Sequence, residues 1–395
     1  MKIAILTSGI LPVPAVKGGA VENLMDFYLA YNDKHRLHDI TVYSVWHPDV
    51  AQHPAQQSEV NHYIYLRVDT LWAKLKKRLF KWTHSKGYYH YTIEYYLDWA
   101  LRQINRQQFD VVITENRPGY ALQLMRQGHQ QVVCHQENDY VNVTTPQHRQ
   151  IYDSTALFIN TSDYITRRVR TISDTDTKCV TVLNGIDVER FYQACPLPRS
   201  AAGLHDEDFV LVFSGRLVEE KGILELIQAI KTLSIPHLKL LIIGASFYGQ
   251  DMKKSPFVKR LEDESESVKD QVVFTGFVPY EQIPSYLKMA DVAVVPSMWE
   301  EPFGLTVAEA MAAGLPLITT RSGGIPEICE GVAEIVDREN VVAHLADAIK
   351  GLYEDTARRR TMAEAALERS KLFSKEAFAR NYFHALENVR VKNEE

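Results

Sequence analysis

Short apolar runs rich in β-branched residues alternate with amphipathic segments along the whole chain. The runs are continuously apolar, which is typical of parallel strands that are covered on both faces. Between two of them, Ile223, Leu226 and Ile230 have the spacing of one buried helix stripe. The strands predicted in this way are residues 2–7, 40–45, 110–114, 131–135, 156–160, 179–183, 209–213, 238–243, 272–275, 292–295, 316–319 and 333–336.

Strands that alternate with helices predict an α/β fold of two Rossmann-like, doubly wound parallel sheets. A chain of 395 residues exceeds what one hydrophobic core organises, so two domains are expected. Residues 194–208 interrupt both patterns with prolines and a glycine. We therefore predict an N-terminal domain over 1–193, a C-terminal domain over 194–373 and a polar helix over 374–395. Ligands of such sheets bind beyond the carboxyl ends of the strands, so we expect the chemistry in a cleft that both domains face.

Composition and charge narrow the class of protein. The chain is 46% hydrophobic and 24% charged, which is ordinary for a globular protein. A net charge of -6 argues against a general nucleic-acid binder. The charge is uneven, because residues 1–192 hold 21 Lys and Arg against 19 Asp and Glu, whereas the remainder holds 23 against 31. We expect the basic half to meet any anionic surface.

Targeting signals are few. Four scattered cysteines without a C-x-x-C pair fit a reducing compartment and predict neither a zinc site nor a disulfide framework. The apolar run at the start of the chain is too short for the core of a signal peptide. No apolar stretch approaches the roughly 18 residues of a membrane-spanning helix. The expected location is cytoplasmic, with any membrane contact confined to the inner surface.

The strongest chemical signal is a pair of carboxylates, Glu301 and Glu309, with Phe303, Gly304 and Leu305 between them. A predicted helix begins at Leu305, so its first amides offer unpaired N–H groups and a positive dipole end to a phosphate. Glu309 lies about one turn inside this helix, where it can accept hydrogen bonds from paired hydroxyls such as a ribose diol. Glutamates on a solvated helix face are the alternative. The Pro-Phe-Gly entrance favours a nucleotide-sugar site.

A second signal follows the predicted strand at 209–213. Gly215 allows the backbone to approach a ligand closely, and Arg216 and Lys221 can reach the same diphosphate. These cations would offset the charge that develops on a leaving nucleotide diphosphate. The alternative is a surface loop whose cations pair with the neighbouring glutamates.

Two further positions carry weaker signals. Gly18 and Gly19 at a helix start can form an anion nest, but their spacing differs from G-x-G-x-x-G, so no nicotinamide cofactor is indicated. A flexible turn is the alternative. His135 ends a predicted strand, from which it could hydrogen-bond a sugar hydroxyl or steady charge at the reacting carbon. A lone histidine in such a place is more often a satisfied polar residue.

Together these segments resemble the family 4 retaining glycosyltransferases of the two-domain glycosyltransferase-B fold, of the type that makes bacterial surface polysaccharides and glycoconjugates. The spacing of Glu301 and Glu309 matches the Glu–seven–Glu motif of that family. The resemblance covers nearly the whole chain, through residues 2–6, 18–19, 183–187, 215–222, 275–277, 301–309 and 323–328.

The resemblance implies roles for individual residues. The catalytic pair would be Glu301 and His135, the diphosphate ligands Arg216, Lys221, Gly19, Gly304 and Leu305, the donor-sugar and ribose ligands Glu301, Phe303 and Glu309, and the base contacts Phe277 and Val278. It also implies a donor-binding C-terminal domain, an acceptor-side N-terminal domain and a final helix that returns to the N-terminal domain. The implied reaction retains the anomeric configuration by front-face attack. It uses the nucleotide sugar, UDP-linked by preference, as a substrate and needs neither a metal nor another cofactor.

Residues 71–82 bear on the acceptor. Leu71, Trp72, Leu75, Leu79 and Trp82 share one helical face, and lysines and an arginine lie largely opposite. This pattern suits an interfacial helix on an anionic membrane that carries a lipid-linked acceptor. It also suits a helix that packs its apolar face into the core, which is the interpretation we favour from sequence. For the tyrosines at 88–96 we also favour packing over stacking against an acceptor sugar.

Two other functions remain open from sequence. A non-catalytic, glycosyltransferase-like scaffold would show degraded motifs, whereas Arg216, Lys221, Glu301 and Glu309 are intact. A sugar-nucleotide epimerase of similar architecture is disfavoured by the Glu301–Glu309 spacing.

Overall fold

The computed structural model describes residues 1–68, 70–83, 87–173, 175–245 and 255–391. By its internal contacts the chain divides into two compact units, Met1–Gly185 with Lys375–Glu395, and Ile186–Ser374. We call these the first and the second unit.

The division after Gly185 comes earlier than the boundary predicted at residue 193. Helix α7 (Val188–Gln193) belongs to the second unit, because it buries Phe191 with its ring against Tyr280 of that unit, 6.1 Å between centroids. The predicted final segment 374–395 joins the first unit from Lys375 onward, and its residues 392–395 lie outside the described chain.

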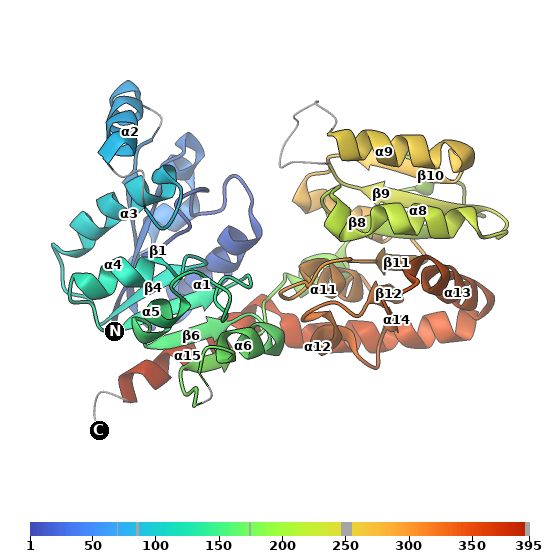
Figure 1. The fold of residues 1–395 in the computed structure, drawn as a ribbon. Coiled ribbons are helices and arrows are strands. Elements are labelled where there is room, and N and C mark those ends of the chain that lie inside the picture. Colours follow the sequence, from blue (N-terminus) through green and yellow to red (C-terminus); the bar gives the residue numbers. More distant parts are fainter. Residues whose placement is uncertain (69, 84–86, 174, 246–254, 392–395) are drawn as a thin grey trace. The chain divides into compact units, whose positions relative to one another are not determined.

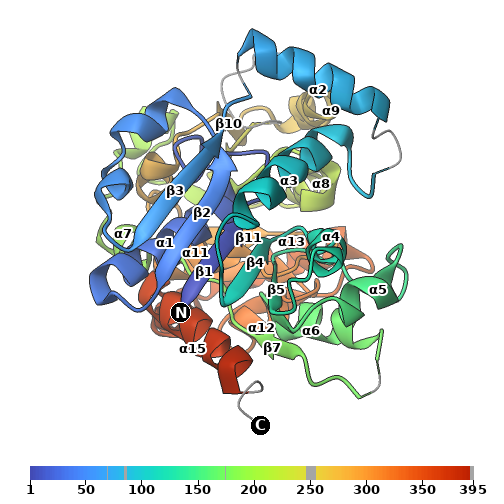
Figure 2. The ribbon, with the colours of Figure 1, turned by 90° about the vertical axis from the view of Figure 1, so that its left-hand side faces the viewer.

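The first unit contains, within the described residues, a seven-stranded parallel sheet in the order β3-β2-β1-β4-β5-β6-β7 (Figure 2). Its strands are β1 (Lys2–Leu6), β2 (Asp39–Val45), β3 (Asn61–Leu66), β4 (Val111–Glu115), β5 (Val132–Gln136), β6 (Leu157–Asn160) and β7 (Cys179–Thr181). All except β3 coincide with predicted runs. Strand β3 escapes the prediction because it is an edge strand that begins with two polar residues and lacks a continuous apolar run.

Helices cover both faces of this sheet (Figure 1). One face carries α3 (Tyr91–Ile104), α4 (Tyr120–Arg126), α5 (His148–Asp153) and α6 (Asp163–Arg170). The opposite face carries α1 (Ala20–His35) and the final helix α15 (Lys375–Val391). Tyr382 and Leu386 of α15 are fully buried, and the Tyr382 ring stacks on Tyr28 of α1 at 4.4 Å. The last helix is thus an integral part of the core of the first unit.

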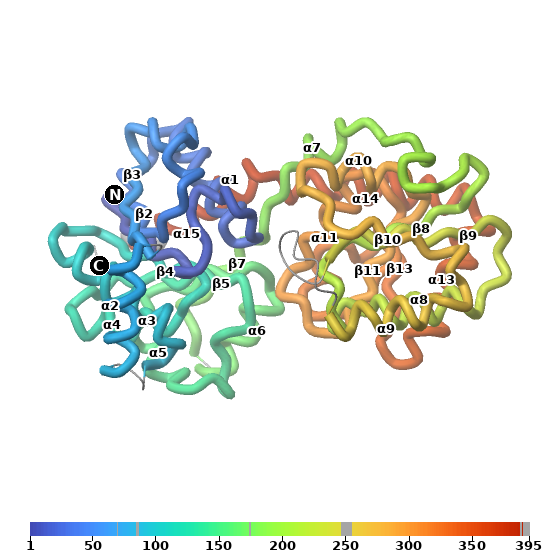
Figure 3. Tube along the Cα trace, turned by 90° about the horizontal axis from the view of Figure 1, so that it is seen from above, coloured from blue at the N-terminus to red at the C-terminus, as the bar shows by residue number. Residues whose placement is uncertain are grey.

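The second unit contains, over the residues that can be described, a six-stranded parallel sheet in the order β10-β9-β8-β11-β12-β13. Figure 3 labels five of these strands, β8, β9, β10, β11 and β13. The strands of the second unit are β8 (Phe209–Ser214), β9 (Leu238–Ile243), β10 (Val272–Gly276), β11 (Val292–Val295), β12 (Leu317–Thr320) and β13 (Glu334–Val336). Its helices besides α7 are α8 (Ile223–Lys231), α9 (Pro256–Ser265), α10 (Ile283–Leu287), α11 (Leu305–Ala312), α12 (Ile325–Cys329), α13 (Val341–Glu354) and α14 (Thr356–Ser370). The prediction of two doubly wound parallel sheets is confirmed.

The strand order of each sheet reverses at one point. In the first unit the reversal lies between β1 and β4, and in the second between β8 and β11. Loops that leave neighbouring strands at such a point diverge to opposite faces, which opens a crevice beyond the strand ends where ligands of α/β sheets bind. The motif residues Arg216 and Glu301 follow the two strands at this point of the second unit.

Helix α2 (Leu71–Thr83) contradicts the interpretation favoured from sequence. It contacts α3, with Ala73 buried and the Phe80 ring edge-on to Tyr95 at 5.5 Å. The predicted apolar face points away from the core instead, so that Trp72 is 74% and Trp82 84% exposed. Leu71, Leu75 and Leu79 are exposed beside them. The helix stands at the surface beside α3 in both ribbon views (Figures 1 and 2).

The tyrosines that follow α2 pack, as predicted. Tyr96 is buried and accepts a hydrogen bond from the Thr7 amide at 3.0 Å. Tyr89 accepts from the Gly119 amide at 2.9 Å, and Tyr88 and Tyr95 pack at the edge of the same core. Among the described helices, none has the length and apolar character to cross a bilayer.

Because α15 is buried in the core of the first unit, a substitution that weakens its packing should lower the stability of that whole unit. Leu386→Ala is expected to lower the free energy of unfolding by about 2–5 kcal/mol, because it removes a fully buried side chain and leaves a cavity. Leu37→Ala, at a half-exposed site of the same unit, should change it by less than about 0.5 kcal/mol. Urea unfolding followed by circular dichroism measures both, and equal losses would contradict the assignment of α15 to this core.

Candidate active site

Glu301 is the centre of the charged cluster in the second unit. It lies in the loop between β11 and α11 and is buried. Its Oε1 accepts from the Lys221 ammonium at 2.6 Å and from the hydroxyl of Ser297, which follows β11. The ammonium also lies 5.7 Å from the centre of the Trp299 ring. A buried carboxylate needs such partners, because an unpaired charge in the interior is costly.

The loop that carries Glu301 is hydrogen-bonded to a glycine-containing turn after β12. The Gly324 amide donates to the Glu301 carbonyl at 2.8 Å, and the Gly323 amide donates to the Glu300 carboxylate at 2.6 Å. A Cβ at Gly323 would lie 2.1 Å from the Glu301 carbonyl oxygen, so only glycine fits. Glu300 is paired in addition with Arg338. Backbone contacts thus hold the Glu301 side chain in place.

Helix α11 starts directly after this loop. Gly304 precedes it with a positive φ of 109°, a conformation that favours glycine, and Phe303 is buried with its ring edge-on to Phe373. Within the described residues, no side chain caps this end. The N–H groups of Leu305 and Thr306 find no hydrogen-bond acceptor in the described parts of the chain. Uncapped amides at a helix start attract anions.

Arg216 follows β8 at the reversal point of the sheet. Its side chain is exposed and makes no ion pair or side-chain hydrogen bond with the residues that the structure describes. It differs in this respect from Lys221, which is paired with Glu301. A cation without a partner at a strand end is available to an anionic ligand.

Glu309 projects from the second turn of α11 and is buried. Burial raises the pKa of Glu309 to about 7, and the Tyr280 hydroxyl, which donates to Oε1 at 2.8 Å, opposes this rise. Phe277 and Val278 precede Tyr280 in the loop after β10. Phe277 is 46% exposed, whereas Val278 is buried. An aromatic ring therefore lies open to the solvent in this loop.

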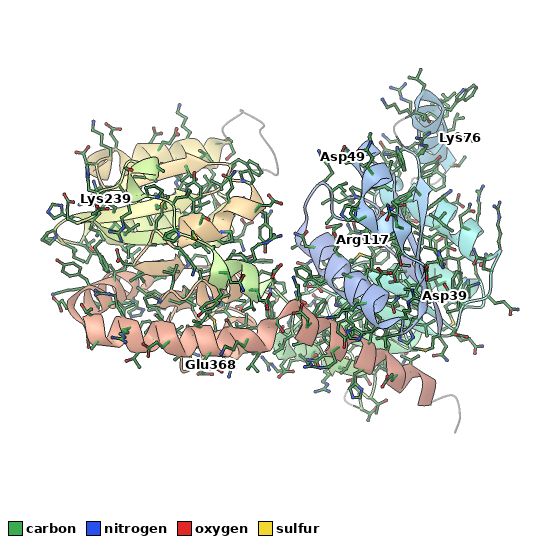
Figure 4. All side chains as sticks on the ribbon, turned by 180° about the vertical axis from the view of Figure 1, so that it is seen from behind. Asp39, Asp49, Lys76, Arg117, Lys239 and Glu368 are labelled. Atoms are coloured by element: carbon green, nitrogen blue, oxygen red, sulfur yellow. The ribbon has the colours of Figure 1, made fainter. Side chains whose placement is uncertain are left out.

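In the first unit, Gly19 precedes α1 at the predicted place. Glu22 in the first turn of α1 is buried and accepts from the Ser8 hydroxyl at 3.1 Å. Burial is the main reason why the pKa of Glu22 is raised. The Arg117 guanidinium, labelled in Figure 4, donates to the Ser8 carbonyl at 3.4 Å. Ser8 therefore contacts both the buried carboxyl group of Glu22 and the Arg117 guanidinium.

His135 is enclosed by carboxylates. Its Nδ1 lies 2.8 Å from Glu115 and its Nε2 lies 3.0 Å from Glu137, the second pair without the alignment of a hydrogen bond. Tyr28 and Tyr382 donate to the second oxygen of Glu115. Burial disfavours the imidazolium, but the two carboxylates outweigh it and raise the pKa of His135 to about 10. The predicted sugar contact needs an exposed ring nitrogen, and the His135 side chain exposes no surface.

Comparison with known proteins identifies the family of this chain. The model of the family described as "Glycosyl transferases group 1" matches residues 198–369. Spore coat protein SA of Bacillus subtilis is 30% identical over 345 residues, which are 84% of this chain and 83% of that protein. The chain belongs to the group 1 glycosyl transferases. It is a retaining glycosyltransferase that uses a nucleotide-sugar donor.

Two further comparisons concern a relative and the fold. The lipopolysaccharide 1,2-N-acetylglucosaminetransferase of Salmonella typhimurium is 28% identical over 205 residues, half of each chain. The structure of Anabaena HepE in complex with UDP-glucose shares the fold, with a TM-score of 0.73 at 19% identity over 98% of this chain and 100% of that one. The glycosyltransferase therefore has the glycosyltransferase-B fold.

Sequence reasoning missed several side chains that this glycosyltransferase places around the predicted residues. Ser297 and Glu115 both lie at strand ends, and the rule that ligands bind there could have selected them. Tyr280 follows the loop predicted to lie near the base. The pairing of Arg338 with Glu300 has no signal in the sequence, because 38 residues separate them.

The enclosed imidazolium predicts a stability effect in this glycosyltransferase. His135→Ala should lower the free energy of unfolding by about 3–5 kcal/mol at neutral pH, because it leaves two buried carboxylates without their cation. A folded-state pKa near 10 exceeds the ordinary value of 6.5, so His135 contributes stability that is complete below pH 6.5 and is lost as the pH rises toward 10. The difference in the free energy of unfolding between the wild-type protein and His135→Ala should therefore decrease as the pH rises from 6.5 toward 10.

Chemical denaturation at several pH values measures this effect. His384→Ala is the matched control, because this histidine of α15 is 78% exposed and should change stability by less than about 0.5 kcal/mol. A loss at His135 no larger than at His384, or a gap that widens with pH, would contradict the role of the buried cation.

Proposed function

We propose that this glycosyltransferase moves a hexosyl unit from a UDP-sugar to a glycan, glycolipid or other acceptor in surface polysaccharide or glycoconjugate biosynthesis. UDP is supported by HepE, which shares the fold and was crystallised with UDP-glucose. The pathway is supported by the relatives that are named a lipopolysaccharide transferase and a spore coat protein. The proposal assigns the donor to the second unit and the acceptor to the first.

One observation carries the donor assignment. Around the reversal point of the second sheet lie a buried Glu301, Lys221, and Arg216 and the amides of Leu305 and its neighbour, which have no partner among the described residues. Positive groups and amides suit a diphosphate, and a carboxylate suits sugar hydroxyls. Few ligands other than a nucleotide sugar combine these two needs.

The roles of the remaining residues follow from their chemistry. Glu301 would accept from donor-sugar hydroxyls beside the Phe303 and Gly304 amides, and Glu309 would accept from the ribose. The exposed ring of Phe277 would stack on the base, with the neighbouring Val278 as a second base contact. The backbone of Gly19 would contact a phosphate of the donor or the acceptor.

His135 enters the proposal in a changed role. Its ring is enclosed, so it would hold Glu115 and Glu137 in place and not touch the sugar. The transfer itself needs no protein nucleophile. The acceptor oxygen bonds to the anomeric carbon on the face from which the diphosphate leaves, and the hydroxyl proton passes to a phosphate oxygen. Arg216 and Lys221 would stabilise the charge on that leaving group.

A membrane-bound acceptor is supported by α2. The helix has no acidic residue and presents five basic ones, at 74, 76, 77, 78 and 81. Lys76, which is labelled in Figure 4, is exposed on this helix. The exposed arc with Trp72 and Trp82 is the face that would enter a bilayer interface, and each lysine or arginine near an anionic surface adds about 1 kcal/mol. We propose that α2 contacts an anionic membrane that carries a lipid-linked acceptor.

Thermal unfolding with a panel of UDP-, GDP- and ADP-glucose tests the donor. Since a ligand that binds only the folded state raises the midpoint by mass action, the UDP sugar should stabilise the protein by about 2.7 kcal/mol at 100 times its dissociation constant. Arg216→Ala should lose most of this shift, because it removes the cation available to the diphosphate. Arg360→Ala, an arginine of α14 that is 83% exposed, should keep it.

A sugar-transfer assay accompanies the panel. Glu301→Gln should abolish transfer while UDP alone still raises the midpoint. No shift with any nucleotide sugar would refute the donor site, and a shift with GDP or ADP sugars alone would refute UDP.

Flotation with vesicles tests the membrane contact. The wild-type protein should bind vesicles rich in phosphatidylglycerol at low salt and release them at high salt, as screened charges require. The double variant Trp72→Ala/Trp82→Ala should bind these vesicles at least about tenfold more weakly than the wild-type protein, because two exposed indoles no longer enter the interface. Tyr140→Ala/Val143→Ala removes two other exposed apolar side chains of the first unit and should bind normally. A wild-type protein that ignores these vesicles would refute this contact.

A further inference from the structure

Tyr280 is the side-chain partner of Glu309 within the described chain. Its hydroxyl donates to Oε1 at 2.8 Å, and no other side chain of the described residues hydrogen-bonds this carboxylate. The second oxygen, Oε2, is therefore left to a ligand. A carboxylate with one oxygen anchored cannot rotate freely, so the direction in which the other oxygen accepts is set by the protein.

Tyr280 itself packs against helix α7. The Phe191 ring meets the Tyr280 ring edge-on at 6.1 Å, and the Arg190 guanidinium lies 5.8 Å from the centre of the Tyr280 ring. Asp187 at the start of α7 accepts from the Arg190 amide and lies within 4.0 Å of its guanidinium. These contacts restrict the movement of the Tyr280 side chain, and a side chain that positions another group benefits from being fixed.

The position of Tyr280 in the chain connects two parts of the site. It follows the loop with Phe277 and Val278 after β10, and it bonds a residue of α11, which follows β11. Since the proposed function gives the base to that loop and the ribose to Glu309, Tyr280 lies between the residues that contact the two halves of one nucleoside.

We propose that Tyr280 is a positioning residue that aims Glu309 at the ribose 2′ and 3′ hydroxyls and makes the donor site selective for ribonucleotides. This inference rests on the proposed function, because it needs a nucleotide in the second unit. A purely structural role would satisfy the buried carboxylate without affecting which sugar it accepts. Selectivity between ribose and deoxyribose is the property that separates the two roles.

Calorimetric titration of UDP and 2′-deoxy-UDP tests the inference. The wild-type enzyme should prefer UDP by about tenfold or more, because a hydrogen bond to a charged group is lost with the 2′ hydroxyl. Tyr280→Phe should weaken UDP binding and reduce the preference to about threefold or less, since the carboxylate is no longer aimed. Tyr353→Phe, whose ring packs against Phe209 in the same unit, is the matched control and should retain the full preference.

A double-mutant cycle with Glu309→Gln shows whether Tyr280 acts through Glu309. If it does, Tyr280→Phe should not reduce the preference further in the Glu309→Gln background, so the two changes are not additive. Thermal unfolding in the absence of ligand shows that each variant is folded. Kinetics give a second readout, a raised donor KM with an unchanged kcat in Tyr280→Phe.

The outcomes separate this inference from the function on which it rests. If neither nucleotide binds the wild-type protein, the proposed donor site itself is refuted. If UDP binds and Tyr280→Phe keeps the full preference for ribose, the positioning role is refuted while the donor site stands. An additive effect of the two substitutions also refutes the role, because Tyr280 would then act by another route.

Discussion

The need to pair buried carboxylates governs how the loops of this glycosyltransferase are arranged. Glu115 and Glu137 lie at or just beyond strand ends, Glu301 lies in the loop after β11 and Glu309 lies in α11, and all four are buried. Removing a carboxylate from water costs several kcal/mol unless a cation or hydrogen-bond donors replace the water. Each therefore binds a group from a distant part of the chain, and these pairings hold the loops in the shape that a ligand would meet.

The two units meet this need in different ways. In the first unit, Glu115 and Glu137 enclose His135, and Tyr382 brings the final helix into the same cluster. The His135 and Glu115 side chains expose no surface, so this cluster stabilises the core of the first unit. In the second unit, Glu301 and Glu309 are held by a lysine and by hydroxyls, with the exposed Arg216 and uncapped amides nearby. Groups that keep free bonding capacity at the surface suit a bound substrate.

Much of the fold was predictable, because continuous apolar runs between amphipathic helices allow few architectures. The runs at 209–213 and 292–295 coincide with β8 and β11, and the predicted helix at Leu305 starts at that residue. The failures were at surfaces and edges. Strand β3 lacks a continuous apolar run, and α2 exposes an apolar face whose pattern equals that of a buried one. Periodicity reports that a face is apolar and cannot report what covers it.

The sequence by itself determined which residue types stand in the segments that follow β8 and β11, including Arg216, Lys221, Glu301 and Glu309, because a motif is a matter of spacing along one chain. Tertiary structure alone decided their partners. Lys221 and Glu301 are 80 residues apart, Tyr280 and Glu309 are 29 apart, and Glu115 and Tyr382 are 267 apart. Such pairings follow from how strands are ordered in a sheet and where helices return. A hydrogen bond acts over about 3 Å in space, whatever the distance along the chain.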